Sequence, residues 1–159
     1  MTRSSGFIHL HRENFLNNMQ IPKTTIIFIK VTDTQSKLVR ICETVQHHFN
    51  EKQSILINAA SEEAAIYIDQ LLWRFPEESF LPHLYTSSPT KEPIVVTTSL
   101  QNLNQAKILF NLGSSISPIS TEFEKIYELY DCTHPQKEQM SKEKLAVYQQ
   151  IPSCEVKKC

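Results

Sequence analysis

Residues 24–31 (Thr-Thr-Ile-Ile-Phe-Ile-Lys-Val) form a nearly continuous apolar run rich in β-branched side chains. A run of this length and composition is typical of a strand buried on both faces. Residues 35–49 then place an apolar side chain every three or four positions, at Leu38, Ile41, Cys42, Val45 and Phe49. This spacing puts them on one stripe of a helix. The chain therefore predicts a buried strand followed by a helix that packs against it.

The alternation continues through residue 75. Residues 53–58 (Gln-Ser-Ile-Leu-Ile-Asn) predict a second short buried strand. Ser61 can cap a following helix, which we expect to end near Phe75-Pro76 because the residue before a proline disfavours helical backbone. Strand, helix, strand, helix indicates parallel pairing with right-handed crossovers. We therefore expect an α/β fold, a single three-layer α/β/α domain with a mostly parallel mixed sheet.

The second half of the chain predicts shorter elements. They are an extended or edge segment at 78–85, strands at 93–98 and 107–112, a strand or short helix at 123–130, and a helix at 136–150. The domain is expected to span residues 24–150. Residues 1–23 are expected to be an N-terminal extension, and residues 151–159 a frayed C-terminal tail.

The chain has only two glycines, Gly6 and Gly113. Phosphate loops and dinucleotide fingerprints need clustered glycines so that the backbone can approach the phosphates closely. The chain therefore lacks the usual phosphate-binding loop of the fold that it predicts. A small α/β enzyme that acts on a nucleotide-like ligand at the carboxyl ends of the strands stays open as an alternative, by analogy with the fold alone.

Charge and targeting signals narrow the class of partner. Sixteen Lys and Arg against 17 Asp and Glu give a net charge of −1, whereas general nucleic-acid binders carry a clear basic excess. No apolar run approaches the length of a membrane span, and the first residues do not form a secretory signal. Four cysteines without paired spacing then favour reduced thiols and a cytoplasmic protein. We expect no strong direct nucleic-acid binding and no membrane association.

Two histidine pairs and one group of cysteines are candidate metal sites. The pairs are His9 with His11 and His47 with His48, and neither has a further ligand at a recognisable spacing. A zinc-stabilised module could use Cys132, His134, Cys154 and Cys159, although their spacing matches no familiar finger. Surface histidines and unpaired thiols are the simpler interpretation, so no metal or other cofactor is expected.

The most informative segment is residues 71–83, which hold the only tryptophan, Trp73, together with two prolines and His83. A tryptophan at a helix end can fill the core beneath a loop, or it can anchor a protein partner. The helix at 136–150 is the second informative segment, since it carries Lys137, Lys142 and Lys144. Those lysines can form a solvated face or a small basic patch suited to an acidic peptide carboxylate.

Residues 68–83 (Ile-Asp-Gln-Leu-Leu-Trp-Arg-Phe-Pro-Glu-Glu-Ser-Phe-Leu-Pro-His) resemble the hallmark of the chi subunit of bacterial DNA polymerase III. Further parts of the chain fit that family in order. They are the strand Pro93-Ile94-Val95-Val96, the strand 108–112, the segment 123–129, and a last helix ending in Tyr148. The likeness covers about residues 24–150.

The resemblance implies a domain that looks like a mononucleotide-binding fold but is not catalytic. Proteins of this family link the clamp loader, through the psi subunit, to the acidic C-terminal tail of single-stranded-DNA-binding protein. The resemblance implies two sets of contact residues. A psi-like subunit would be contacted by Trp73, Phe80, Pro82 and His83. The tail would be contacted by Tyr130, Lys137, Lys142, Lys144 and Tyr148.

Overall fold

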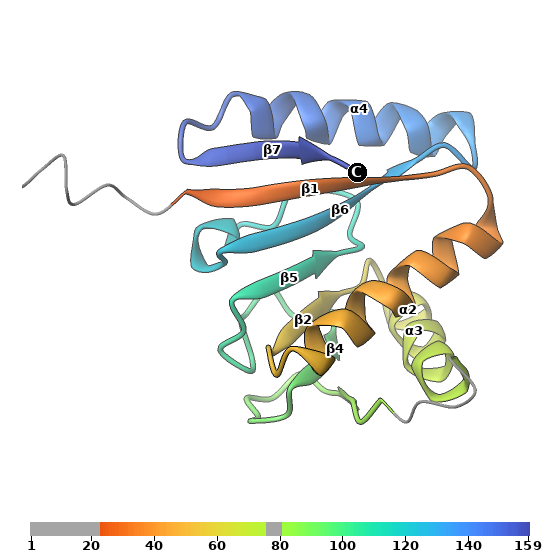
Figure 1. Cartoon of the computed structure of the whole chain (residues 1–159), viewed down its shortest axis with the longest axis vertical. Coiled ribbons are helices and arrows are strands. Elements are labelled where there is room, and N and C mark those ends of the chain that lie inside the picture. Colours follow the sequence, from red (N-terminus) through yellow and green to blue (C-terminus); the bar gives the residue numbers. More distant parts are fainter. Residues whose placement is uncertain (1–22, 76–80) are drawn as a thin grey trace, which may run out of the picture.

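The computed structural model describes residues 23–75 and 81–159, and in these residues seven strands form one parallel sheet. The strand order is β3-β4-β2-β5-β6-β1-β7, and every neighbouring pair runs parallel (Figure 1). The strands are β1 (Thr24–Val31), β2 (Ile55–Asn58), β3 (Leu84–Tyr85), β4 (Ile94–Thr97), β5 (Ile108–Asn111), β6 (Lys125–Asp131) and β7 (Cys154–Lys158). The predicted α/β class is confirmed.

Helices cover both faces of this sheet. They are α2 (Thr34–Asn50), α3 (Glu62–Arg74) and α4 (Pro135–Gln149), with a short 3-10 turn, η1 (Ser120–Glu122), before β6. Figure 1 shows α2 and α3 lying together over β2 and β4, while α4 runs along β7. Alternate residues of each strand supply the two faces, as expected for strands buried on both sides. Ile57 and Phe110 pack with α2 and α3, whereas Leu56 and Leu109 share the other cluster with α4.

Each helix begins at a side chain that satisfies a free backbone N–H. Asp33 accepts from Ser36 N, Ser61 accepts from Ala64 N, and His134 accepts from Gln136 N. These are N-cap hydrogen bonds, and the cap predicted at Ser61 is confirmed. All three caps lie just after a strand or a short loop that follows one, so the three helices start at the same edge of the sheet.

The C-terminal segment differs from the prediction. Residues 151–159 were expected to fray, but β7 pairs with β1 from Thr24 opposite Cys154 to Phe28 opposite Lys158. Cys154 and Val156 pack against the cluster beneath α4, while Glu155 and Lys157 face solvent. Backbone pairing and two apolar contacts stabilise this strand of five residues. Its sequence is mostly charged, so the strand is not evident from composition. The predicted N-terminal extension, apart from Lys23, lies outside the described residues.

Because all strands are parallel, their carboxyl ends meet at one edge of the sheet. This edge is where ligands bind in open α/β folds, at points where successive connections leave toward opposite faces. Here β2 leads to α3 on one face, and the neighbouring β5 leads to the loop and η1 on the other. In the part of the chain that is described, no helix is long and apolar enough to cross a membrane.

Candidate protein-interaction site

Trp73 lies in the last turn of α3, and about half of its surface is exposed to solvent. Its residue is 51% exposed, and its ring meets that of His83 with centroids 4.3 Å apart. The His83 side chain is fully buried. The tryptophan therefore keeps one face against a buried ring and presents the rest outward. Trp73 therefore combines the two predicted roles: part of it packs against the protein, and part of it is available to anchor a partner.

The His83 ring is held by oxygen acceptors on both sides. Its Nδ1 lies 2.7 Å from the Leu81 carbonyl oxygen, and its Nε2 lies 2.9 Å from the Asp69 carbonyl oxygen. The Asp69 carboxylate lies 3.1 Å from the same Nε2. These contacts tie the segment after α3 back to the helix and fix the plane of the imidazole. The Trp73 ring lies against this imidazole, a contact that restricts the ring before any partner binds and so lowers the entropy lost on binding.

Other large apolar side chains are exposed around the same helix and the edge strand beside it. They are Ile66, Tyr67, Phe75 and Leu84. Ile66 and Trp73 are seven residues apart, so they lie on one face of α3. Exposed apolar surface of this kind marks protein contacts more often than chance. Of the other predicted contacts, Pro82 is half-buried, and Phe80 lies outside the described residues.

The residues predicted for the acidic tail do not form one surface. Tyr148 is fully buried, with its ring edge toward Phe28 at a centroid distance of 6.0 Å. Tyr130 is half-buried against the same cluster. Lys142 is exposed on α4 and lies 3.9 Å from the Glu138 carboxylate. Lys137 and Lys144 instead line a pocket at the carboxyl edge of the sheet.

Beneath α4, Glu128 of β6 is fully buried and holds together three neighbouring side chains. Lys144 Nζ lies 3.1 Å from its Oε1, while Tyr148 Oη and Asn111 Nδ2 each donate to its Oε2 at 3.3 Å. Burial raises the pKa of Glu128 to about 7, although Lys144 and these hydrogen bonds act in the opposite direction. Burial, together with the nearby Glu128 charge, also raises the pKa of Tyr148.

Glu128 should make folding stability fall as the pH rises. Its folded pKa of about 7 lies above the unfolded value of 4.5, so the folded state binds the proton more tightly between these values. We expect urea unfolding of the wild type to show a loss on the order of 2 kcal/mol from this group between pH 5 and pH 8.

The Glu128→Gln variant isolates that effect, because its amide oxygen can still accept from Tyr148 and Asn111. Its free energy of unfolding should depend less on pH than that of the wild type over the same range. His48 contributes in the opposite direction in both proteins, because burial lowers its pKa. Equal pH slopes for wild type and variant would contradict the assignment.

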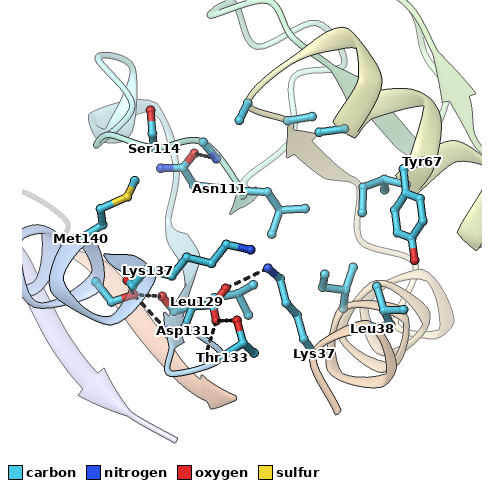
Figure 2. A pocket seen from close by; sticks show the side chains of 18 of the residues that line it. Lys37, Leu38, Tyr67, Asn111, Ser114, Leu129, Asp131, Thr133, Lys137 and Met140 are labelled. Carbon is cyan, nitrogen blue, oxygen red and sulfur yellow. Dashed lines mark hydrogen bonds and ion pairs between the residues drawn. The ribbon is translucent and has the colours of Figure 1, made fainter. Parts of the chain in front are cut away.

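The pocket at the carboxyl edge lies between α2, α3 and α4 and has a volume of about 490 Å³ (Figure 2). Lys37 of α2 and Asp131 at the end of β6 form an ion pair across it at 2.8 Å. Burial acts to raise the pKa of Asp131, but hydrogen bonds from Lys37 and Thr133 hold it below the usual value. The titratable groups gathered here are thus engaged mainly with one another, an arrangement unlike an acid and base poised over a substrate.

The proposed zinc ligands are not brought together. The four cysteines are free, and the described residues contain no group of three or more His, Cys, Asp or Glu that could hold a metal ion. Cys42 is buried, and burial raises its pKa to about 11. The pair His9 and His11 lies outside the described residues, while the rings of His47 and His48 meet edge to face.

Comparison with known proteins decides the family. A family model described as "DNA polymerase III chi subunit, HolC" matches residues 24–151. The chain belongs to the DNA polymerase III chi subunit family. A curated relative, the DNA polymerase III subunit chi of Haemophilus influenzae, is 28% identical over 90 residues. That match covers 55% of this chain and 62% of the relative, so the chain spans less than two thirds of the relative's length.

The family is one of DNA polymerase III chi subunits. The hallmark around Trp73 lies inside the matched region, and so do the pocket and the buried group at Glu128. Sequence reasoning missed Lys37 and Asp131 because they are far apart in the chain and each looks like an ordinary surface charge. Glu128 could have been found from the sequence. Ile126, Glu128 and Tyr130 are two residues apart, so they lie on the same face of the strand, and the carboxylate stands between two apolar side chains.

Proposed function

We propose that this chain is a non-catalytic adaptor that links the clamp loader, through a psi-like subunit, to the acidic C-terminal tail of single-stranded-DNA-binding protein. The observation that carries the proposal is Trp73, half-exposed and oriented by a buried histidine in a chain of the chi family. An exposed, preoriented tryptophan is the kind of residue that dominates protein interfaces.

The psi-like contact is proposed for the end of α3 and the edge strand beside it. Trp73 supplies the central anchor there, and Leu84 of β3 supplies a second exposed apolar side chain. His83 and Pro82 act by shaping the segment that supports the tryptophan. A partner that covers this surface removes from water apolar area that the isolated chain leaves exposed, which is favourable at roughly 25 cal/mol per Å².

The tail contact is proposed for the exposed face of α4, with Lys142 as its cation. Tyr148 has no exposed surface, so its proposed part is to anchor α4 from beneath, together with Lys144 and Glu128. Exposed ion pairs contribute little each and are screened by salt. The affinity for the tail should therefore be modest, in the micromolar range as an order of magnitude, and should fall as ionic strength rises.

A bridging assay tests the adaptor proposal. A peptide that copies the acidic tail is fixed to beads, and a psi-like subunit should be retained only when this chain is added. Lys142→Glu should weaken peptide binding about tenfold at low salt, because it replaces an attractive charge with a repulsive one. Fluorescence anisotropy of the labelled peptide measures that loss.

Lys107→Glu is the matched control, since Lys107 is also exposed and paired with a glutamate, Glu124, at 3.5 Å. It makes the same change in net charge at the opposite edge of the sheet, where β5 begins. The control should reduce binding far less than Lys142→Glu. Equal losses for the two variants, or no salt-sensitive binding at all, would contradict the tail contact.

A further inference from the structure

The pocket at the carboxyl edge of the sheet is not used by the proposed psi-like contact. It lies where β2, β5 and β6 end and where α2 and α4 begin, and its volume of about 490 Å³ is in the range of small-molecule sites. Figure 2 shows side chains from both helical layers directed into this space. The walls of the pocket therefore come from several strands and helices of the fold.

Positive charge predominates in the pocket. Three lysines line it, Lys37, Lys137 and Lys144, against one carboxylate, Asp131. Lys37 is paired with Asp131 at 2.8 Å, and Lys144 is paired with the buried Glu128 at 3.1 Å. Lys137 has no ion pair with any residue in the described part of the chain. One cation is thus left to attract an anion.

The direction of these lysines strengthens that conclusion. Figure 2 shows the ammonium groups of Lys37 and Lys137 directed into the pocket from opposite walls. Asp131 already balances the charge of Lys37, so an anion between the two ammonium groups gains the unpaired charge of Lys137 and a second N–H donor from Lys37. The first turns of α2 and α4 line the same space, so the positive ends of both helix dipoles add to the attraction.

The rest of the lining is mainly apolar and supplies few groups to recognise a sugar or a base. Leu38, Leu112, Leu129 and Met140 contribute the walls, with Tyr67 beside them. The polar side chains of Asn111, Thr133 and Ser141 are already hydrogen-bonded to protein atoms. This lining favours an apolar body over the ribose and base of a nucleotide.

We propose that this pocket binds a small amphipathic anion, namely an aromatic or branched aliphatic body that carries one carboxylate or phosphate. The anionic group lies between Lys137 and Lys37, and the apolar body lies against Leu112 and Leu129. The proposal does not depend on the adaptor role, because it concerns binding by the purified chain alone.

The test is a titration of the full chain with 3-phenylpropanoate and with phenyl phosphate, followed by amide NMR shifts. Both probes combine an aromatic ring with one anionic group, and the two arms distinguish a carboxylate site from a phosphate site. We expect saturable shifts near Leu112 and Gly113 for at least one probe. The neutral 3-phenylpropanol and inorganic phosphate alone should each bind at least fivefold more weakly.

Lys137→Gln should weaken binding of the preferred probe by about five- to tenfold, since it removes a charged hydrogen-bond donor from a partly exposed site. Lys107→Gln, which removes an equal charge at the other edge of the sheet, should leave the affinity unchanged. Thermal unfolding of both variants checks that they are folded. Absence of saturable shifts with both probes would overturn the proposal, as would equal binding of the neutral alcohol or equal losses in the two variants.

Discussion

Trp73→Ala is expected to weaken binding to a psi-like clamp-loader subunit by at least about thirtyfold, which corresponds to roughly 2 kcal/mol. The side chain offers a large apolar surface of which half is exposed before binding. Its ring is already oriented by His83, so little additional ordering opposes association. Isothermal titration calorimetry with the purified partner measures the loss.

Two further variants locate the source of that affinity. Val147→Ala is the control, because Val147 is also 51% exposed but lies on α4, away from α3. It should leave the affinity for the psi-like subunit unchanged. Trp73→Phe should give an intermediate affinity, since a smaller ring can still lie on His83. Full affinity in Trp73→Ala would contradict the proposed contact.

His83→Ala should also reduce partner binding, although the His83 side chain has no exposed surface of its own. The substitution removes the ring against which Trp73 lies and the hydrogen bonds to Leu81 and Asp69. His83 is in this sense a positioning residue. The loss of binding should be accompanied by a change in the fluorescence of Trp73, the only tryptophan in the chain. A variant that is merely less stable, measured below its transition temperature, does not show this fluorescence change.

The regular elements could largely be predicted from local pattern. The apolar run at 24–31, the stripe from Leu38 to Phe49 and the cap at Ser61 each encode their element within a few residues. The last strand could not be found in this way, because β7 has only five residues and is stabilised by pairing with β1, more than 120 residues away. Local pattern carries no information about such a partner.

The site was predicted unevenly for the same reason. Trp73 stood out because it is the only tryptophan and lies in a distinctive motif, and the structure shows that it is half-exposed. The tail residues follow from the family resemblance along the chain, but side-chain direction divides them, since Lys142 faces solvent and Tyr148 faces the core. The pocket between Lys37 and Asp131 joins residues 94 positions apart, so only the folded topology reveals it.

Tyr148→Ala is expected to be the most destabilising of these substitutions, costing about 3 to 5 kcal/mol. Tyr148 is fully buried and packs edge to face on Phe28 beneath α4. Truncation leaves a cavity between the helix and the sheet, and it also removes the hydroxyl that donates to Glu128. The midpoint of thermal unfolding should fall by roughly 10 to 15 °C, as measured by circular dichroism.

Tyr148→Phe separates the packing of this ring from its hydrogen bond. It keeps the aromatic volume and removes one donor, while Asn111 and Lys144 continue to satisfy Glu128, so a loss of only about 1 kcal/mol is expected. If Tyr148 acts by anchoring α4, this variant should bind the acidic tail peptide as the wild type does. Loss of peptide binding in a Tyr148→Phe protein of nearly normal stability would instead mean that the hydroxyl contacts the peptide, and that α4 moves to expose it.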